Sequence, residues 1–385
     1  MKILIIATLF PNKINPVRGI FVKEQVEILS HYFDNLFVFD CTPYNFKEWF
    51  AKDCFFVGHR TESSYNVFSY HPRVFMTERF PKLAQFSFDS CVKKLLKKYI
   101  AMFGKPDLII SHFSFMAGFS AKKIFNSYGI PFVVIEHGSL FLQNNLCHFL
   151  IKQLNDEINK AKRIICVSEH LKESIIKLAY NSSIKKIMVI NNYVNPIFTF
   201  NEQKSTNNCF VFLSAGMLLP NKNFDLLINS FCKAFSKDER VILEIAGSGK
   251  EHDTLQKMIL SKNRENQIFL VGKLDRTGML AKYQSCDSFV LFSQYETFGL
   301  VYREAMAVGR PVVSSLNGGI EENWEDGFGI LVKTFDADDC AIALRQMVNR
   351  YQEYDKQYIS KRTLELYSQK TTIEVLKRII LEETK

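Results

Sequence analysis

The sequence has no stretch of about 18 uninterrupted apolar residues, the length that a membrane-spanning helix needs. Its first apolar run, Met1–Leu9, is too short to cross a bilayer. Phe10-Pro11-Asn12 follows that run without the small-residue site at which a signal peptide is cleaved. We therefore expect a soluble protein, and we take the run as a buried parallel strand that ends in a turn.

The nine cysteines include no C-x-x-C pair, and their number is odd. This argues against a disulfide framework and a zinc ribbon, and a reducing cytoplasm fits it best. Short internal repeats and low-complexity segments are also lacking. The 385 residues, 47% hydrophobic and 23% charged, have globular composition and exceed what one hydrophobic core usually supports. We therefore expect two domains.

Negative charge is scarce in the first half of the chain. Residues 1–200 hold 25 Lys and Arg against 15 Asp and Glu, whereas residues 201–385 hold 24 against 25. The whole excess of positive charge therefore lies in the first half. Such an asymmetry indicates an anionic partner for that half, either nucleic acid or an acidic membrane surface.

Strand-like apolar runs alternate with helical patterns, which is typical of βαβ units and a parallel sheet. In the first half we predict strands at 2–7, 36–39, 108–111, 132–136 and 163–167, and helices at 22–31, 115–128 and 169–179, the last with Ser168 as N-cap. In the second half we predict strands at 210–215, 241–246, 268–271, 288–292 and 311–314, and helices at 224–235, 278–284, 302–308 and 339–350. The polar stretch 191–208 between them is the candidate linker. The pattern predicts two doubly wound α/β domains that face each other across a cleft, with ligands at the carboxyl ends of the strands.

The segment Ser293–Val313 places Glu296 and Glu304 eight residues apart, roughly two turns of a helix. If Glu296 follows a strand and Glu304 lies in the next helix, both carboxylates can face one crevice. Carboxylates there suit the hydroxyls of a ribose and a sugar, which donate hydrogen bonds. Thr297-Phe298-Gly299 would open the helix, whose free N–H groups favour a phosphate. By spacing alone, two such glutamates are more often a solvated surface.

The same segment, SQYETFGLVYREAMAVGRPVV, resembles the E-x7-E signature of the retaining glycosyltransferases of family 4, the group 1 transferases. Nearly every position matches over about 18 residues. The resemblance implies the GT-B fold, in which two Rossmann-like domains face each other. It implies that Glu304 binds the nucleotide ribose and Glu296 the donor sugar. It also implies donor contacts from a short backbone stretch, Thr297, Phe298, Gly299 and Leu300.

The resemblance continues in the first half. Arg18–Gln25, after Phe10-Pro11, is similar to the family's first loop and helix, where Gly19 would let the backbone approach the diphosphate closely. Glu136-His137-Gly138 ends a predicted strand and matches the family's active-site histidine of the first domain. A lone histidine is more often a packing or capping residue. The position at a strand's carboxyl end favours a catalytic role for His137.

Ser214–Leu218, with Lys222 following, is similar to the family's diphosphate-binding stretch. The resemblance implies that Gly216 and Lys222 bind the donor and that Lys222 assists departure of the diphosphate. Members often carry an arginine where this sequence has Met217, so one cation is missing. Either the affinity for the donor is lower, or another basic residue substitutes, with Arg303 and Arg310 as the candidates.

Gly247-Ser248-Gly249-Lys250 is not a P-loop, because Glu251 replaces the required Ser or Thr and Glu244 stands where the first glycine should be. In the family this is a G-x-G loop, which implies that Gly247 and Gly249 contact the nucleotide through their backbone. Asn317–Glu322 likewise matches a glycine pair near the donor.

Asp336-Ala337-Asp338 imitates the D-x-D metal motif of a different transferase fold, but an N-cap for the helix at 339–350 explains it better. We therefore expect no metal and no cofactor besides the donor.

Val92–Ile100 is a basic amphipathic segment with four lysines, at 93, 94, 97 and 98. It indicates either membrane-surface contact or an ordinary solvated helix face. Nucleic acid is disfavoured, since the nearby aromatic residues follow no RNA-binding pattern.

Together these patterns predict a retaining hexosyltransferase that uses a UDP- or GDP-sugar and a polysaccharide or lipid-linked acceptor. We expect it in the cytoplasm, either free or as a peripheral protein on the cytoplasmic face of the inner membrane. The expected domains are 1–200 for the acceptor, 201–370 for the nucleotide-sugar, and a helix at 371–385 that packs back on the first domain. The alternatives are a nucleotide-sugar epimerase of the same fold and a sugar-nucleotide-binding subunit with weakened catalysis. The loops at 44–80, where the acceptor would bind, carry no readable pattern.

Overall fold

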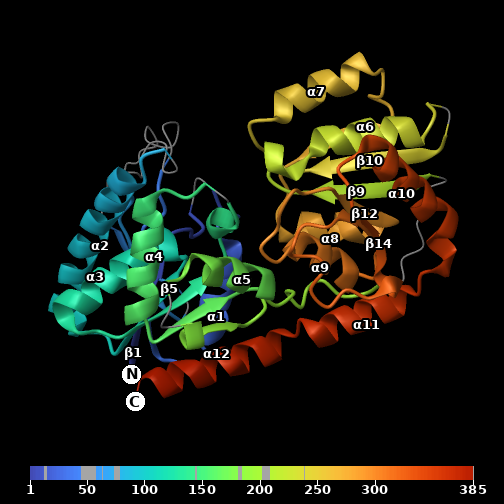
Figure 1. Cartoon of the computed structure of the whole chain (residues 1–385). Helices are drawn as coiled ribbons and strands as arrows, with labels where there is room; N and C mark the ends of the chain where they lie inside the picture. The colour runs from blue at the N-terminus through green and yellow to red at the C-terminus, as the bar shows by residue number, and fades with distance from the viewer. Residues whose placement is uncertain are drawn as a thin grey trace. The chain divides into compact units, whose positions relative to one another are not determined.

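The computed structural model describes residues 1–12, 15–44, 58–62, 64–72, 79–143, 145–180, 184–201, 209–237 and 239–384. The chain divides into two compact units, Met1–Asn191 with Lys370–Lys385, and Asn192–Gln369 (Figure 1). The first unit is therefore built from both ends of the chain. Among the described helices, none combines the length and the apolar character that crossing a membrane requires.

The first unit contains a sheet of eight described strands in the order β3-β4-β2-β1-β5-β6-β7-β8. The strands are β1 (Lys2–Ala7), β2 (Asn35–Asp40), β3 (Gly58–Thr61), β4 (Asn66–Ser69), β5 (Leu108–His112), β6 (Phe132–Glu136), β7 (Arg163–Cys166) and β8 (Ile187–Val189). Neighbours pair in parallel except β3 and β4, which form an antiparallel edge. The strand order reverses between β1 and β5, and ligands of doubly wound sheets bind at such a reversal.

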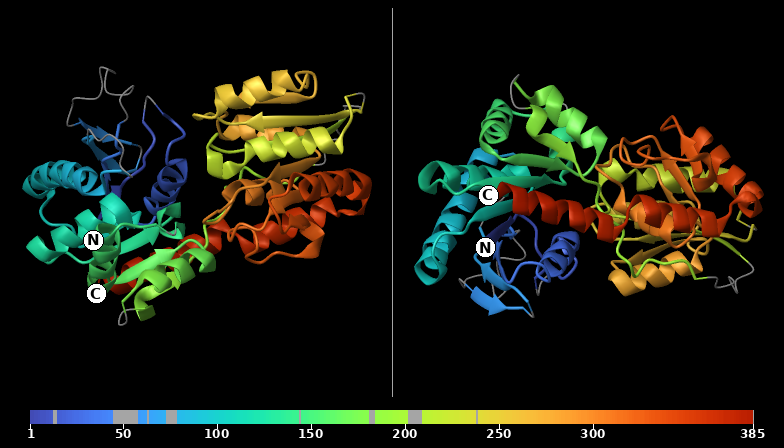
Figure 2. Two further views of the ribbon diagram at one scale, coloured as in Figure 1. Left: turned by 45° about the horizontal axis from the view of Figure 1, so that its top comes forward. Right: turned by 90° about the horizontal axis from the view of Figure 1, so that it is seen from below.

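Helices flank this sheet: α1 (Ile20–Leu29), α2 (Pro81–Phe103), α3 (Phe119–Tyr128), α4 (His148–Lys160), α5 (Glu169–Leu178) and α12 (Gln369–Glu383), with short turns η3 (Ser114–Gly118), η4 (Ser139–Leu142) and η5 (Ile184–Lys186). Of these, α2, α3 and α4 contact one another. The strands β1, β5 and β6 are buried along almost their whole length, as in a parallel sheet covered on both faces. The start of β1 and the end of α12 lie close together in every view (Figure 2).

The second unit contains a parallel sheet of six described strands in the order β11-β10-β9-β12-β13-β14. These are β9 (Phe210–Ala215), β10 (Val241–Ala246), β11 (Ile268–Gly272), β12 (Ser288–Leu291), β13 (Val312–Ser315) and β14 (Gly329–Val332). The main helices are α6 (Phe224–Ala234), α7 (His252–Ser261), α8 (Arg276–Ser285), α9 (Leu300–Ala307), α10 (Ala337–Arg350) and α11 (Lys356–Leu366). Here the order reverses between β9 and β12, which makes their carboxyl ends the expected ligand edge.

The predicted pair of α/β domains with parallel sheets is confirmed. The boundary lies earlier than the predicted 200/201, because residues 192–201 pack with the second unit: Val194 N donates to Tyr367 O at 3.1 Å, and Phe198 is buried against Tyr283. Residues 202–208 of the candidate linker lie outside the described residues. So do 45–57, 63 and 73–78 of the expected acceptor loops.

Two predicted helix caps are confirmed, and one predicted helix needs correction. Ser168 Oγ accepts from Leu171 N at 3.1 Å, and Asp336 accepts from the N–H groups of Asp338 and Asp339. The helix expected at 115–128 begins only at Phe119, because Met116 has a φ of 71°, which a right-handed helix does not tolerate.

Candidate active site

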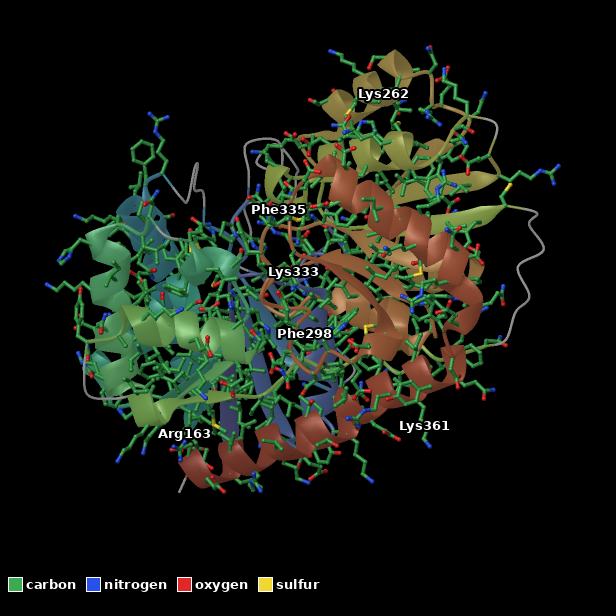
Figure 3. All side chains as sticks on the ribbon, turned by 45° about the vertical axis from the view of Figure 1, so that its right-hand side comes forward. Arg163, Lys262, Phe298, Lys333, Phe335 and Lys361 are labelled. Atoms are coloured by element: carbon green, nitrogen blue, oxygen red, sulfur yellow. The ribbon has the colours of Figure 1, made fainter. Side chains whose placement is uncertain are left out.

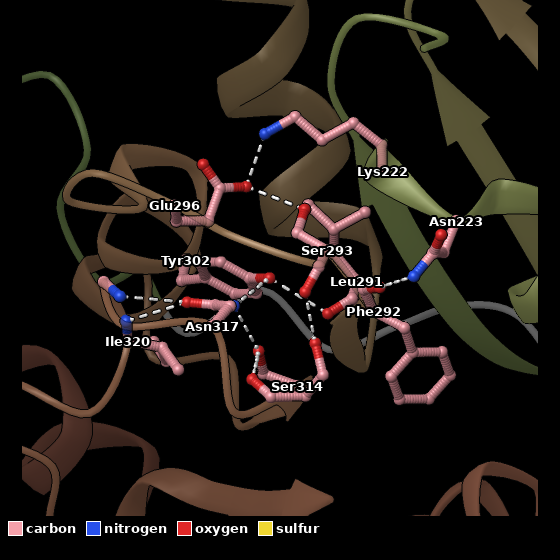
Figure 4. A network of polar contacts seen from close by, with 12 residues as sticks. Lys222, Asn223, Leu291, Phe292, Ser293, Glu296, Tyr302, Ser314, Asn317 and Ile320 are labelled. Carbon is pink, nitrogen blue, oxygen red and sulfur yellow. Dashed lines mark hydrogen bonds and ion pairs between the residues drawn. The ribbon is translucent and has the colours of Figure 1, made fainter. Parts of the chain in front are cut away.

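Lys222 and Glu296 meet at the carboxyl ends of β9 and β12 (Figure 4). After β9 the chain forms the short turn η6 (Pro220–Lys222), and after β12 it passes through Ser293 to Glu296 before α9 begins. Lys222 Nζ donates to Glu296 Oε1 at 2.5 Å, and Ser293 Oγ donates to the same oxygen at 2.8 Å. The two side chains of the ion pair are 18% and 12% exposed, so a ligand can reach them.

The loop after β13 holds Glu296 in place through its backbone and through Asn317. Asn317 O accepts from Glu296 N at 2.9 Å, and Asn317 Oδ1 accepts from the N–H groups of Gly319 and Ile320. Asn317 Nδ2 donates to the hydroxyl of Tyr302, a buried residue of α9, at 3.1 Å. A Cβ atom on Gly319 would lie 2.8 Å from Glu296 Cβ, so any side chain there would displace Glu296. The glycine pair noted in the sequence therefore contacts a candidate site residue directly.

Glu304 lies inside α9, as predicted, and is only 3% exposed. Its Oε1 forms an ion pair with Arg276 Nη1, and its Oε2 accepts from Tyr283 OH at 3.1 Å. Burial, followed by the neighbouring Glu304 carboxylate, raises the pKa of Tyr283 well above its usual value, which keeps the hydroxyl a donor. Sequence reasoning identified neither Arg276 nor Tyr283.

The stretch from Thr297 to Leu300 leads into α9. Gly299 is the N-cap of this helix with a φ of 75°, and Leu300 is the first helical residue. Phe298, labelled in Figure 3, is buried. Its ring packs edge-on against Tyr367, with ring centroids 5.2 Å apart. The first N–H groups of a helix lack intrahelical partners and attract a phosphate. The local structure is therefore suited to an anion.

Two glycine loops pack tightly at the same edge. Leu218 N, two residues after Gly216, donates to Ser248 O at 3.0 Å, and Gly216 N donates to Ala246 O at 3.0 Å. A Cβ on Gly247 would lie 1.9 Å from Gly216 O, and one on Gly249 would lie 2.3 Å from Leu218 O. The close approach of the two backbones therefore requires glycine at positions 247 and 249, whether or not these residues contact a nucleotide.

Met217 is 63% exposed at this edge, and neither arginine suggested as its replacement is available. Arg303 is buried and donates through Nη2 to the carbonyls of Gly319, Ile320 and Glu322. Arg310 is buried and donates through Nη2 to Gln284 O at 2.7 Å. Both guanidinium groups brace the fold, and the suggestion that one of them replaces the missing charge is wrong.

In the first unit the structure gathers residues around His137, at the carboxyl end of β6. His112, the last residue of β5, stacks on His137 with ring centroids 5.3 Å apart, and His112 Nδ1 lies 3.1 Å from His137 Nε2, within hydrogen-bond distance. Burial lowers the pKa of His112 to about 3, so this ring is neutral. Phe21 and Phe113 complete the surroundings, with centroids 4.9 and 5.5 Å from the His137 ring.

Gly19 places Phe21 in that cluster. It is the N-cap of α1 with a φ of 68°, and a Cβ on it would lie 2.5 Å from Leu9 O. The loop after β1 can therefore pack this closely only with glycine at this position. The two candidate residues of the first unit, Gly19 and His137, thus belong to one local arrangement at the reversal between β1 and β5.

A buried carboxylate joins the backbone after His137 to the segment that follows β5. Glu136 Oε2 accepts from Ser114 N at 2.7 Å and its Oε1 accepts from Gly138 N at 2.6 Å. Burial raises the pKa of Glu136, and these hydrogen bonds oppose the shift. Glu157 of α4 is fully buried close by, and burial raises its pKa to about 8. His112 and Glu136 each end an apolar strand, and that exception to the apolar pattern was a signal in the sequence.

Within the described residues, no cluster of three or more His, Cys, Asp or Glu side chains could hold a metal ion. The eight described cysteines are all free thiols.

Two family models match the chain in succession. Glycosyltransferase Family 4 matches residues 53–197, and Glycosyl transferases group 1 matches residues 197–363. The crystal structure of HepE from Anabaena, solved in complex with UDP, is similar with a TM-score of 0.74 at 20% identity, over 99% of this chain and 100% of that one. The chain belongs to the family 4-like glycosyltransferases of the GT-B fold.

Two curated relatives of this family 4-like transferase are 29% and 26% identical to it over the aligned stretches. An uncharacterised glycosyltransferase of Methanocaldococcus jannaschii is 29% identical over 247 residues, which is 63% of this chain and 66% of the relative. The GPI3 subunit of the phosphatidylinositol N-acetylglucosaminyltransferase of Saccharomyces cerevisiae is 26% identical over 265 residues, 63% of this chain and 58% of that protein. The matched stretches thus span two thirds or less of these relatives.

Proposed function

We propose that the protein is a retaining glycosyltransferase that moves a hexose-type sugar from a UDP- or GDP-sugar to a polysaccharide or lipid-linked acceptor. The observation that carries the proposal is the contact of Lys222 with Glu296 at the strand reversal of the second unit. Ion pairs at the surface are common, but this one lies at the edge where doubly wound sheets bind ligands and beside a helix N-terminus.

In this proposal the second unit holds the donor. Glu304 accepts hydrogen bonds from the ribose, and Glu296 accepts them from the donor sugar. Lys222 moves from Glu296 to the diphosphate and, with the first N–H groups of α9, stabilises the negative charge that develops on the leaving group. The glycines of the two loops, Gly216, Gly247 and Gly249, let the backbone approach the nucleotide. No metal takes part.

The first unit serves the acceptor. His137 contacts the acceptor hydroxyl, and Gly19 lets the loop after β1 bring Phe21 against the His137 ring. The UDP-bound HepE structure supports a nucleotide donor, and the name of the yeast relative, which acts on phosphatidylinositol, supports a lipid-linked acceptor.

The test is a donor screen followed by a transfer assay. UDP and GDP are compared by thermal shift, since a ligand that binds only the native state raises its stability. Glu304→Ala should abolish the shift. Radiolabelled sugar nucleotides are then incubated with the protein and a membrane extract. Label in lipid or polysaccharide supports transfer, an altered free sugar nucleotide supports the epimerase, and binding without turnover supports the weakened subunit.

A finer part of the proposal is that α2 rests on an anionic membrane surface. The exposed side of this helix carries Leu83 and Phe86 near its start, 63% and 69% exposed, and four exposed lysines further on, Lys93, Lys94, Lys97 and Lys98. Asp89, the sole acid of α2, pairs with Lys123. Exposed apolar side chains and a run of lysines on one side of a helix suit the interface of an anionic bilayer.

Vesicle sedimentation tests this part. The protein should pellet with phosphatidylcholine vesicles that contain phosphatidylglycerol, and much less with phosphatidylcholine alone. Replacing all four lysines by glutamine, or Leu83 and Phe86 by serine, should move it to the supernatant. Lys160→Gln/Lys257→Gln, which removes lysines outside α2, serves as the control. Equal partitioning of all variants would contradict membrane docking.

A further inference from the structure

The carboxylate of Glu304 is held at both oxygens by one helix, α8. Arg276, the first residue of α8, pairs with Oε1, and Tyr283, seven residues and about two turns later, donates to Oε2. The two groups therefore project from one face of α8. A carboxylate held through both oxygens has a fixed plane, because rotation would break one of the two contacts.

Arg276 is itself held in place. Its guanidinium carbon lies 5.5 Å from the centroid of the Phe198 ring, and that ring meets Tyr283 edge-on at 5.6 Å. Asp275 caps α8 by accepting from Gly278 N at 2.8 Å, which fixes the turn from which Arg276 projects. Stacking and capping reduce the freedom of a long side chain, so little additional ordering is needed when a ligand binds.

Arg276 also comes from the correct edge of the sheet. Gly272, which ends β11, accepts from Gly247 N through its carbonyl at 2.8 Å, so the loop before α8 adjoins the glycine loop after β10. The Arg276 side chain is 23% exposed while that of Glu304 is 4% exposed. The Arg276 side chain is thus partly exposed to solvent, and the Glu304 carboxylate that it contacts is nearly buried.

We infer that Arg276 is a positioning residue of the donor site, which holds Glu304 in the orientation in which it accepts hydrogen bonds from the ribose. The inference rests on the proposed function, since it presumes that Glu304 binds a nucleoside. A carboxylate has about four acceptor positions, so Arg276 and Tyr283 can fix it while it accepts further hydrogen bonds. Arg276 therefore acts through Glu304 and not on the diphosphate.

A double-mutant cycle tests this inference. Affinities for UDP, GDP, UMP and GMP are measured by calorimetry for the wild type, Arg276→Gln, Glu304→Gln and the double variant. Arg276→Gln should weaken binding about tenfold, the size of one charge-assisted hydrogen bond, and by the same factor for the diphosphate and the monophosphate. The double variant should bind no more weakly than Glu304→Gln alone, because the arginine then has no carboxylate to position.

Two further variants separate positioning from folding. Arg276→Lys keeps the charge and should recover part of the affinity. Lys282→Gln removes another ion pair of α8, in which Lys282 Nζ lies 2.7 Å from Glu244 Oε1, and should leave affinity unchanged. Thermal midpoints without ligand show whether each variant is folded.

The possible failures are distinguishable. Additive losses in the cycle, or a larger loss for the diphosphate than for the monophosphate, would show that Arg276 acts on its own or on the phosphates, and would overturn the inference alone. Unchanged affinity of Arg276→Gln would do the same. A wild type that binds none of the four nucleotides would overturn the proposed function and this inference with it.

Discussion

At the scale of single residues, glycine is required at the carboxyl ends of the strands of the second unit for two reasons. One is the lack of room for a side chain, and the other is the positive φ angle. Gly247 has a φ of 153° and no room for a Cβ, whereas Gly272 has a φ of 77° and nothing within 4 Å of a Cβ. Both belong to the second unit. A substitution at Gly272 therefore adds backbone strain alone, and one at Gly247 adds strain and a collision.

We predict that Gly272→Ala costs about 1 kcal/mol of unfolding free energy and that Gly247→Ala costs more than about 2 kcal/mol. Urea unfolding measures both, followed by the fluorescence of Trp324 in a Trp49→Phe background, since the chain has two tryptophans. Gly247→Ala should also weaken nucleotide binding. Equal costs would mean that the loop yields to a side chain without loss.

The fully buried carboxyl of Glu157 makes stability depend on pH. Its pKa is about 8 in the folded protein, against an ordinary value of 4.5, because burial disfavours the charged form. The folded state therefore holds a proton that the unfolded chain releases between these two pH values. The stability that this residue contributes is complete below about pH 4.5 and is lost as pH rises through about 8.

We predict that Glu157→Gln flattens this pH dependence, which amounts to at most about 1.4 kcal/mol per pH unit. Glu136 and Asp40 are also buried carboxyls with raised pKa values, so the measured quantity is the difference in slope between variant and wild type. Unfolding free energies at a series of pH values provide it. Glu173→Gln, which changes an exposed acid on α5, should keep the wild-type slope.

At the scale of elements, helix α2 braces the strained segment after β5. Phe113 and Met116 have positive φ values of 73° and 71°, which are unusual for residues with side chains. Gln85 of α2 binds the Met116 peptide on both sides: Oε1 accepts from Met116 N at 3.0 Å and Nε2 donates to Met116 O at 3.1 Å. This clamp holds Phe113 beside His137.

We predict that Gln85→Leu destabilises the first unit by about 2 kcal/mol or more, because it leaves buried backbone groups of Met116 without these partners. Transfer activity should fall further than stability alone explains, since Phe113 would move from His137. Hydrogen exchange of the segment 113–118 reports the loosening. Ser90→Ala, an exposed change on the same helix, should alter neither quantity.

The central strands were predictable from sequence because buried parallel strands are continuous apolar runs. The predicted ranges 2–7, 132–136, 210–215 and 241–246 have the observed bounds. The edge strand β3, with the sequence GHRT, is short and polar and gave no such signal. The break before α3 was also hidden, because strain at Phe113 and Met116 depends on the tertiary contacts of Gln85.

The residues of the candidate site likewise fall into those that the sequence predicted and those that it did not. Glu296 and Glu304 follow from a long motif and its spacing, and Lys222 follows from the separate stretch after the strand at 210–215. The structure brings Lys222 and Glu296 together. Arg276 and Tyr283 were not predictable, because their role depends on how the face of α8 meets α9. Arg276 and Tyr283 are far from Glu304 in the sequence, and the order of the strands in the folded sheet brings them to its carboxylate.

At the scale of the whole molecule, the last helix completes the unit that the first strand begins. The helix α12 buries Ile373, Leu376, Ile379 and Ile380 in the first unit. Arg163 Nε, labelled in Figure 3, donates to Glu383 at 2.8 Å, and Lys377 lies over the ring of Tyr32. The first unit thus depends on a segment that the chain supplies last.

We predict that Leu376→Ala destabilises the first unit by about 2–4 kcal/mol, the usual cost of removing a buried leucine side chain. Leu381→Ala is the matched control: it removes the same atoms from the same helix, but Leu381 is 43% exposed against 3% for Leu376. Hydrogen exchange should rise in β1, β7 and α12 for Leu376→Ala and stay unchanged for Leu381→Ala. The prediction follows from the few apolar side chains through which α12 packs on the first unit. Equal hydrogen exchange in the two variants would contradict it and would mean that the contacts of Glu383 and Lys377 hold α12 in place.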